Sequence, residues 1–272
     1  MMIFLLEECN FACPHCVRED EPMDRGYRLS SRELQLCLSD CRTLKSIDWV
    51  HFSGGEPTLW REGSRNLADL LLEISEAGFT PGFTTNGSLF LDYDRCRDFL
   101  NSYVDRSDRP VILYLSIDTF HGNFDVEKKR ALSLNNVLKF RRSLPPGKVD
   151  LLDIRALVVI SRDTKSLLPD EMVQHYTLLD VKFVFVPLTP KGKARDLKDL
   201  CPDLRSGSPE DLGAYLPFHN SSREAEPEDR SKAQNMILIG GNYYFSNPWR
   251  KIARLGHLPE DIVRIYSDEA RP

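Results

Sequence analysis

The segment Cys9-Asn-Phe-Ala-Cys13-Pro-His-Cys16 places three thiols within eight residues, directly after the apolar run Met2–Leu6. An odd total of seven cysteines and this close spacing indicate a metal site rather than a disulfide framework. Thiolates select zinc, copper(I) or iron–sulfur clusters. A structural zinc needs a fourth ligand, for which His15 is the nearby candidate but is tightly constrained by the loop, whereas a three-cysteine cubane leaves one iron open.

The bulk composition narrows the function classes. The chain has 272 residues, 41% of them hydrophobic, and a formal net charge of −5. It is therefore long enough for one large α/β domain, or for a domain of about 200 residues with a small appendage, and it has no overall cationic field for nucleic acid. The N-terminus MMIFLLEECN lacks a basic region and reaches acids at Glu7 and Glu8, so we expect neither a signal peptide nor a membrane span. The reduced-thiol pattern predicts a cytoplasmic protein.

Short apolar runs rich in β-branched and aromatic residues alternate with segments of helical periodicity. This pattern is typical of a parallel sheet with crossover helices, in which all strand-to-helix junctions share one edge. The predicted strands are Ile3–Leu6, Trp49–Ser53, Thr80–Thr84, Val111–Ile117, Leu152–Val159 and Val181–Val186. The first predicted helix begins at the capping signal Ser30-Ser31-Arg32-Glu33. Four further helices are predicted over Leu67–Ala77, Leu91–Tyr103, Val126–Leu144 and Ser166–Leu178, the last starting after Pro169.

Three further motifs stand where predicted strands end. They are Ser53-Gly-Gly-Glu-Pro57, Thr84-Thr-Asn-Gly87 and Ser116-Ile-Asp118. Paired glycines let backbone approach a ligand without interference from a Cβ atom, and a carboxylate supplies a charge-assisted acceptor for an ammonium group. Parallel strands bring these motifs and the cysteine loop to the same edge, where α/β proteins place their ligands.

This conjunction resembles the radical S-adenosylmethionine (SAM) superfamily over roughly residues 1–190. The resemblance implies an α/β fold with a partial (β/α)6 barrel of parallel strands. It also implies one [4Fe–4S] cluster held by Cys9, Cys13 and Cys16, which cleaves SAM to a 5′-deoxyadenosyl radical that abstracts hydrogen from a substrate. An enzyme of this kind, an oxidoreductase in the broad sense, takes electrons from a donor such as flavodoxin or ferredoxin.

The resemblance also implies the SAM contacts. The Gly-Gly-Glu motif, Gly54, Gly55 and Glu56, would hold the amino group of SAM, with Asn86 in the neighbouring Thr-Asn-Gly turn. Ser116 and Asp118 would contact its ribose or methionine portion. By position alone, Arg155 would pair with its carboxylate, and backbone at Val186 would meet its adenine. His15 takes the place of the aromatic residue that the family often has beside its last cysteine.

The tail after Pro187 resembles a SPASM or twitch extension. Pro187–Arg195 is similar to the stretch that follows the sixth strand there, and Ile239–Pro248 with Leu255–Asp261 is similar to its hairpin and following helix. Ser246 and Asn247 stand where an auxiliary-cluster cysteine would be expected, and Cys201 is the only thiol in the tail. We therefore expect a core domain over 1–190 and a metal-free extension over 191–272, with a mobile region around 203–233.

Several other residues carry a functional and a structural interpretation. Cys37 and Cys41 share a helix face and, like Cys96, are expected to be packed thiols rather than ligands. His121 is equally compatible with orienting substrate and with an ordinary loop position. The residues with weaker functional interpretations are Cys201, Tyr243, Tyr244, Trp249 and the basic cluster Lys191, Lys193 and Arg195, which would suit an anionic substrate.

Three functions stay open from the sequence. The first is a radical SAM enzyme acting on a small molecule, favoured because no peptide-recognition domain precedes the first strand. The second is a peptide- or protein-modifying member of the same family. The third, from another class, is a non-catalytic α/β protein with structural zinc. Neither nucleic acid nor a membrane is expected as a partner.

Overall fold

The computed structural model describes residues 1–16, 26–42, 47–121, 124–125, 130–161, 170–188 and 192–200, and three strands within 236–257. The region around 203–233, predicted to be mobile, lies outside the described residues, as do Cys201, Lys191 and Trp249. The division into domains at residue 190 stays a prediction.

Six parallel strands form the centre of the sheet, in the order β10-β9-β6-β5-β2-β1. The predicted strands are all confirmed, with ends that differ by at most one residue. They are β1 (Met2–Leu6), β2 (Trp49–Gly54), β5 (Thr80–Thr85), β6 (Val111–Ser116), β9 (Leu152–Ile160) and β10 (Lys182–Pro187). The α/β class and the partial barrel of parallel strands are therefore confirmed.

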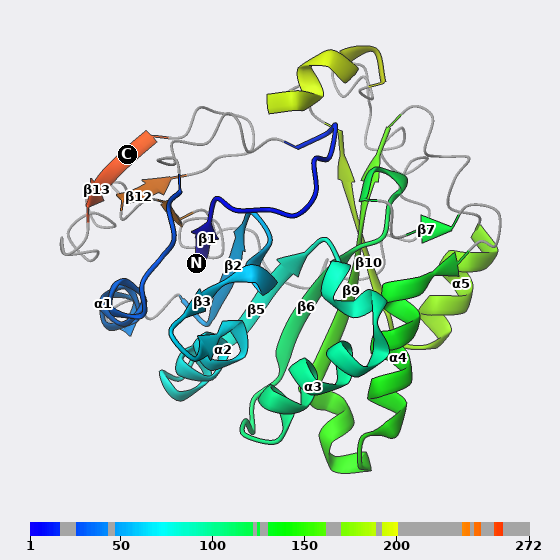
Figure 1. Cartoon of the computed structure of the whole chain (residues 1–272), viewed down its shortest axis with the longest axis horizontal. Coiled ribbons are helices and arrows are strands. Elements are labelled where there is room, and N and C mark those ends of the chain that lie inside the picture. Colours follow the sequence, from blue (N-terminus) through cyan, green and yellow to red (C-terminus); the bar gives the residue numbers. More distant parts are fainter. Residues whose placement is uncertain are drawn as a thin grey trace, which may run out of the picture.

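The α-helices cover the convex side of this curved sheet (Figure 1). They are α1 (Ser31–Arg42), α2 (Leu67–Glu76), α3 (Tyr93–Val104), α4 (Leu132–Ser143) and α5 (Asp170–Leu178). Short helices lie near strand ends, namely η2 (Pro57–Leu59), η3 (Ser88–Leu91), η4 (Thr119–His121), η5 (Pro146–Leu151) and η7 (Gly192–Leu200). The main core lies between the sheet and these helices, because side chains alternate along each strand and one set faces the helices.

One helix prediction was wrong at its start. The helix predicted over Val126–Leu144 begins only at Leu132, because β8 (Arg130–Ala131) pairs with β7 (Phe124–Asp125) as a short antiparallel ladder. Backbone groups used in that ladder cannot also make helical hydrogen bonds. The helical periodicity of the sequence therefore begins several residues before the helix itself, in a segment whose ends pair as strands.

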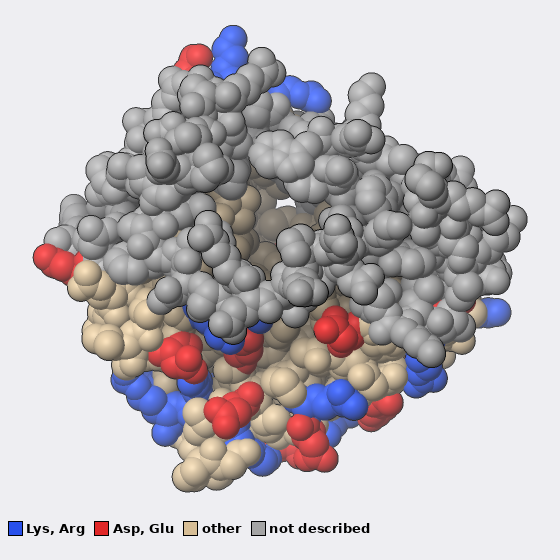
Figure 2. Space-filling model, turned by 180° about the vertical axis from the view of Figure 1, so that it is seen from behind, with Lys and Arg blue, Asp and Glu red and all other residues tan. Residues whose placement is uncertain are grey.

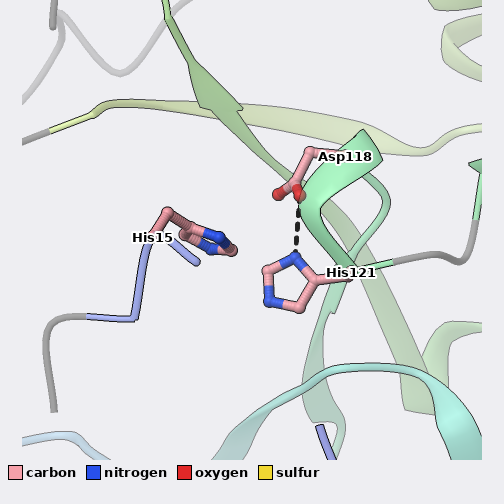
Figure 3. Close-up of side chains that lie close together, drawn as sticks. All are labelled: His15, Asp118 and His121. Atoms are coloured by element: carbon pink, nitrogen blue, oxygen red, sulfur yellow. Dashed lines mark hydrogen bonds and ion pairs between the residues drawn. The ribbon is translucent and has the colours of Figure 1, made fainter. Parts of the chain in front are cut away.

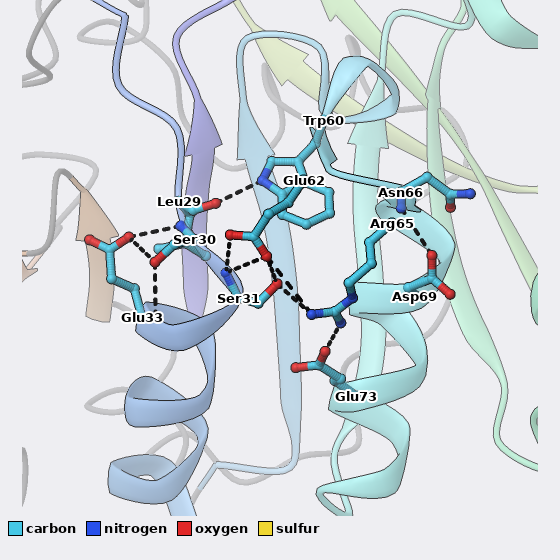
Figure 4. Close-up of polar contacts among 10 residues, drawn as sticks. All are labelled: Leu29, Ser30, Ser31, Glu33, Trp60, Glu62, Arg65, Asn66, Asp69 and Glu73. Carbon is cyan, nitrogen blue, oxygen red and sulfur yellow. Dashed lines mark hydrogen bonds and ion pairs between the residues drawn. The ribbon is translucent and has the colours of Figure 1, made fainter.

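The first helix is fastened to the hairpin of β3 (Arg61–Glu62) and β4 (Arg65–Asn66) by polar contacts (Figure 4). Ser31 Oγ hydrogen-bonds the Glu62 carboxylate and accepts from Arg65 Nη1 at 2.5 Å. Arg65 also forms an ion pair with Glu73 of α2. These contacts connect α1 with the segment that follows β2, so the elements beside the cysteine loop are held together.

Two helix starts follow the capping-box rule. Ser30 Oγ accepts from the backbone N–H of Glu33 at 3.2 Å, and the Glu33 carboxylate accepts from the backbone N–H of Ser30 at 2.8 Å. Asn66 and Asp69 form the same reciprocal pair at the start of α2. The first of these boxes was predicted from the sequence.

Strands from the C-terminal part extend the same sheet beyond β1. Strand β11 (Met236–Ile239) pairs with β1 in parallel, and β12 (Asn242–Phe245) and β13 (Ala253–His257) follow antiparallel. The predicted hairpin over Ile239–Pro248 includes the end of β11 and all of β12, whose pairing is antiparallel. Leu255–His257, the start of the segment Leu255–Asp261 that was predicted as the following helix, belongs instead to β13, and residues 258–272 lie outside the described part.

Acidic and basic side chains are interspersed on the described part of the face in Figure 2. None of the helices in the described ranges is both long and apolar enough to span a bilayer.

Candidate active site

The three cysteines of the Cys9–Cys16 loop lie at the carboxyl edge of the sheet, directly after β1. All three side chains are partly exposed, and all line one cavity of about 250 Å³. Within the loop, the N–H of Cys16 donates to the carbonyl of Cys13 at 3.2 Å, which closes a turn over Pro14 and His15. Three thiols thus converge on the cavity from one short segment.

The ends of five further strands complete the cavity wall, as expected for the carboxyl edge of a parallel sheet. Polar residues come from the ends of β2, β5 and β6, and apolar ones from β9, β10 and the residue after β10. The lining residues outside the cysteine loop are Ser53, Gly54, Gly55, Thr84, Thr85, Asn86, Ser116, His121, Leu157, Val159, Val186 and Leu188.

The glycines of Gly54-Gly55 serve a close approach between backbones. Gly54 has φ +118°, and a Cβ atom there would lie 2.7 Å from the carbonyl oxygen of Leu6. The N–H of Gly55 donates to that same oxygen at 2.7 Å, and the N–H of Glu56 donates to Glu8 O at 2.8 Å. Only glycine fits at position 54, so this motif seats the end of β2 against the start of the cysteine loop.

Glu56 lies beneath the cavity wall and is fully buried. Its carboxylate accepts four hydrogen bonds, from the N–H and Oγ1 of Thr58, Oγ1 of Thr85 and the N–H of Asn86, at 2.7–3.1 Å. Burial raises the pKa of this carboxyl group, and the same hydrogen bonds oppose that effect. Glu56 thus joins η2 to the end of β5, and it is not among the described residues that line the cavity.

Asn86 projects from the end of β5 towards the cysteine loop. Its Oδ1 accepts from the N–H of Ser88 at 2.9 Å, which fixes the amide so that Nδ2 faces the other way. Nδ2 then donates to Asn10 Oδ1 at 2.8 Å and lies 3.8 Å from the sulfur of Cys9. The Thr-Asn-Gly turn therefore contacts one of the predicted cluster ligands, Cys9.

Asp118 and His121 form a hydrogen-bonded pair after β6 (Figure 3). Asp118 Oδ1 lies 2.8 Å from His121 Nδ1 and accepts from the N–H of Phe120 at 3.0 Å, while Oδ2 accepts from the N–H of Val159 at 3.3 Å. Burial would raise the pKa of Asp118, but the interactions with His121 outweigh it and lower the pKa. Asp118 is 2% exposed and lies behind the described lining residues.

His121 is the member of this pair that reaches the cavity. Burial would lower its pKa, but hydrogen bonds to Asp118 and Cys13 outweigh that effect and raise the pKa to about 9. The ring of His15 packs edge-on against it, with centroids 4.6 Å apart. Burial and the neighbouring His121 lower the pKa of His15 to about 4.

His15, Asp118 and His121 offer metal-ligand atoms within 4.8 Å of one another. Both oxygens of Asp118 already accept hydrogen bonds from its own strand end and from β9. We therefore interpret Asp118 as the residue that orients His121 rather than as a metal ligand.

Arg155 does not take the place predicted for it. Its guanidinium donates to Asp153 Oδ2 at 2.8 Å and to the hydroxyl of Tyr114 at 2.7 Å. It is absent from the described lining of the cavity, whereas Leu157 and Val159, two and four residues further along the same face of β9, are present. The side chain thus lies deeper in the barrel than predicted. Val186 lies on the lining of the cavity.

The short helix η7 also contacts the cysteine loop. The N–H of Lys193 donates to the carbonyl of Cys16 at 3.0 Å, and buried Ala194 packs with Val159 and Leu188. The side chains of Lys193 and Arg195 are exposed here.

The other thiols behave as packed residues. Cys37 and Cys41 are fully buried in α1 with their sulfurs 4.0 Å apart. Cys96 is also fully buried, and burial raises the pKa of its thiol to about 12. These features support the expectation that none of the three is a cluster ligand.

Sequence reasoning missed several cavity residues. Ser53 and Thr84 lie inside quoted motifs but were not singled out, and Leu157, Val159 and Leu188 carry no distinctive chemistry. Alternation along β9 is the signal that could have found Leu157 and Val159, since these residues share a face with Arg155.

The residues present at the site have the chemistry that an iron–sulfur cluster requires. Three soft ligands converge on a cavity, and N–H groups of Phe11 and Asn86 lie 3.5 and 3.8 Å from the sulfur of Cys9. Hydrogen bonds to thiolates of this kind are what such clusters need from a protein. The polar strand ends beside the cysteines leave room for a ligand at the open iron.

Comparisons with known proteins agree with this site. The Radical SAM superfamily profile matches residues 3–143. The chain is similar to a "Tungsten-containing aldehyde ferredoxin oxidoreductase cofactor-modifying protein" of Pyrococcus furiosus, with 25% identity over 69% of this chain and 51% of that protein. It is also similar to a GTP 3′,8-cyclase of Parasynechococcus marenigrum, with 34% identity over 39% of this chain and 31% of that protein.

A third relative is an S-adenosylmethionine-dependent nucleotide dehydratase of Selenomonas ruminantium, with 28% identity over 33% of this chain and 30% of that protein. The chain spans about half or less of the length of these relatives. The superfamily match nevertheless covers more than half of this chain and includes the Cys-x₃-Cys-x₂-Cys loop. The chain therefore belongs to the radical SAM superfamily, whose enzymes use a [4Fe–4S] cluster and SAM.

Proposed function

We propose that this chain abstracts a hydrogen atom from a small-molecule substrate bound beside SAM at the carboxyl edge of the barrel. The observation that carries the proposal is the single cavity shared by Cys9, Cys13 and Cys16 and the motif residues of three strand ends. With cluster and SAM bound, this site is supplied with a 5′-deoxyadenosyl radical. Family membership sets aside the non-catalytic zinc alternative.

The predicted site residues divide into two groups by what they can do. We assign direct SAM contact to the predicted residues that line it, namely His15, Gly54, Gly55, Asn86, Ser116 and Val186. Glu56, Asp118 and Arg155 lie outside the described lining of the cavity and contact other residues instead of SAM. Glu56 holds the backbone of Asn86, Asp118 holds His121, and Arg155 is held by Asp153 and Tyr114.

The apolar part of the wall supports a radical reaction. Leu157, Val159 and Leu188 line the cavity, and the last two pack against buried Ala194. A wall of this kind excludes water, which would otherwise compete for a reactive intermediate, and it holds the target C–H group in a fixed position.

The substrate class rests on a weaker argument. Two of the relatives are named for GTP and for nucleotides. The exposed side chains of Lys193 and Arg195 beside the cysteine loop would favour an anionic small molecule. We further propose flavodoxin or ferredoxin as the electron donor.

Transfer of deuterium tests this proposal. The anaerobically reconstituted protein is incubated with SAM, dithionite and deuterated candidates, including nucleotides, other small metabolites and peptides. The mass of the 5′-deoxyadenosine released is then measured, with Cys13→Ala as the inactive control. We expect one deuterium to appear in 5′-deoxyadenosine with a small-molecule candidate. Transfer from peptides alone would show instead a peptide-modifying enzyme.

A further inference from the structure

We infer that Asn86 is a hydrogen-bond donor to the cluster thiolate of Cys9, and that Glu56 is the positioning residue that holds it there. The inference rests on the proposed cluster site. It assigns to these two motif residues a role in setting the reduction potential of the cluster, in addition to any contact with SAM.

The direction of the Asn86 amide is determined by its neighbours. Oδ1 accepts the backbone N–H of Ser88 at 2.9 Å, so Nδ2 must face the cysteine loop. There it donates one hydrogen to Asn10 Oδ1 at 2.8 Å and lies 3.8 Å from Cys9 Sγ. An NH₂ group has two hydrogens, so both contacts can be made together.

The backbone of Asn86 is equally fixed. Its N–H donates to Glu56 Oε2 at 2.7 Å, and Glu56 Oε1 accepts from Thr85 Oγ1 at 2.8 Å. Glu56 is fully buried, and its remaining hydrogen bonds go to Thr58. The carboxylate therefore restrains the end of β5, because its hydrogen bonds to Thr85 and Asn86 limit the movement of Asn86, whose side-chain amide is the donor.

Cys9 receives a second donor from within the loop. The backbone N–H of Phe11 lies 3.5 Å from the same sulfur. A side-chain donor from β5 and a backbone donor from the loop thus meet at one thiolate. Such donors stabilise the more negative, reduced state of a cluster, because they offset part of the added charge, and this raises its potential.

Three variants of the reconstituted holoprotein test the inference by measuring the midpoint potential and the iron content. In Asn86→Leu the donor is lost at nearly constant shape, so we expect four irons per chain and a lower potential than in the wild type. In Asn86→Asp the donor is replaced by a negative charge, so the potential should fall further. In Glu56→Gln, whose amide cannot accept all the present donors, a smaller fall in the same direction is expected.

Asn136→Leu is the matched control. Asn136 donates its amide to the carbonyls of Phe90 and Leu91, so this variant loses two hydrogen bonds close to η3 without touching a cysteine. It should keep the wild-type potential. An unchanged potential in Asn86→Leu, or a fall of equal size in Asn136→Leu, would overturn the inference.

The result separates this inference from the proposed function. A wild-type protein that assembles a cluster but transfers no hydrogen would contradict the proposed function, while the potentials of the variants could still be compared. Variants that lose iron without a change in the potential of the remaining cluster would show that Asn86 acts only on assembly, which contradicts the inference alone.

Discussion

His51 of β2 makes the folded chain sensitive to acid. The side chain is 3% exposed, its Nε2 lies 2.8 Å from Thr84 Oγ1, and its Nδ1 has no hydrogen-bond partner among the described residues. A Cβ atom on Gly82 would come within 2.8 Å of that Nδ1, so the ring is tightly enclosed. Burial, with the positive charges of the N-terminal ammonium and Arg155, lowers the pKa of His51 from 6.5 to about 3.

The sign and size of the effect follow from proton linkage. Between pH 6.5 and about 3 the unfolded chain carries a proton on His51 that the folded chain does not, so the free energy of unfolding decreases as the pH falls. The slope for one proton is about 1.4 kcal/mol per pH unit. At pH 5.0, about 1.5 units below the unfolded pKa, His51 therefore lowers the stability by about 2 kcal/mol.

Urea unfolding of the cluster-free chain, followed by circular dichroism at pH 7.5 and 5.0, measures this loss. In His51→Gln the titrating group is gone, so the variant should lose about 2 kcal/mol less than the wild type between the two pH values. Thr84→Val is the control, because it removes the hydrogen bond but keeps the buried imidazole, and it should show the wild-type pH dependence. Equal pH dependence in wild type and His51→Gln would refute the reasoning.

Three further changes have expected outcomes. Trp60→Phe leaves the carbonyl of Leu29 without the indole N–H that donates to it at 2.7 Å, so the free energy of unfolding should fall by about 1–3 kcal/mol in urea titrations. Asn66→Ala removes the capping box of α2 and should lower the melting temperature, with a cost of about 1 kcal/mol. Gly54→Ala forces a Cβ atom against Leu6 O and should reduce the iron bound after reconstitution, while wild-type iron content would contradict the role of this glycine.

The strands and the location of the site could be predicted from the sequence for a physical reason. In a parallel sheet every strand end reaches the same edge, so Cys9, Gly54, Asn86 and Ser116 had to meet once the strands were recognised. This meeting can be predicted without knowing how any side chain is oriented. The same argument explains why residues of the predicted motifs are among those that line the cavity.

The partners of the buried charges could not be predicted in this way. The carboxylate of Glu56 turns to Thr58, Thr85 and Asn86 because β2 and β5 are neighbours with a particular register, which periodicity does not specify. Arg155 has a partner two residues away in Asp153, and this local pair keeps it below the cavity. Depth along a strand depends on the stagger of the barrel, and a single sequence carries little information on that stagger.

The start of α4 shows a different limit. The helical pattern continues through residues 126–131, but a two-residue ladder between Phe124–Asp125 and Arg130–Ala131 competes for the backbone. Tertiary context overrides propensity in such short segments.

Iron content and SAM cleavage measured together test the central claim most directly, namely that Cys9, Cys13 and Cys16 hold the cluster. After anaerobic reconstitution with iron and sulfide, the wild type and Cys96→Ala, whose thiol is buried far from the cavity lining, should bind four irons per chain and release 5′-deoxyadenosine from SAM. Cys13→Ala should lose both. Stoichiometric zinc without SAM cleavage in the wild type, or full iron content and cleavage in Cys13→Ala, would contradict the claim.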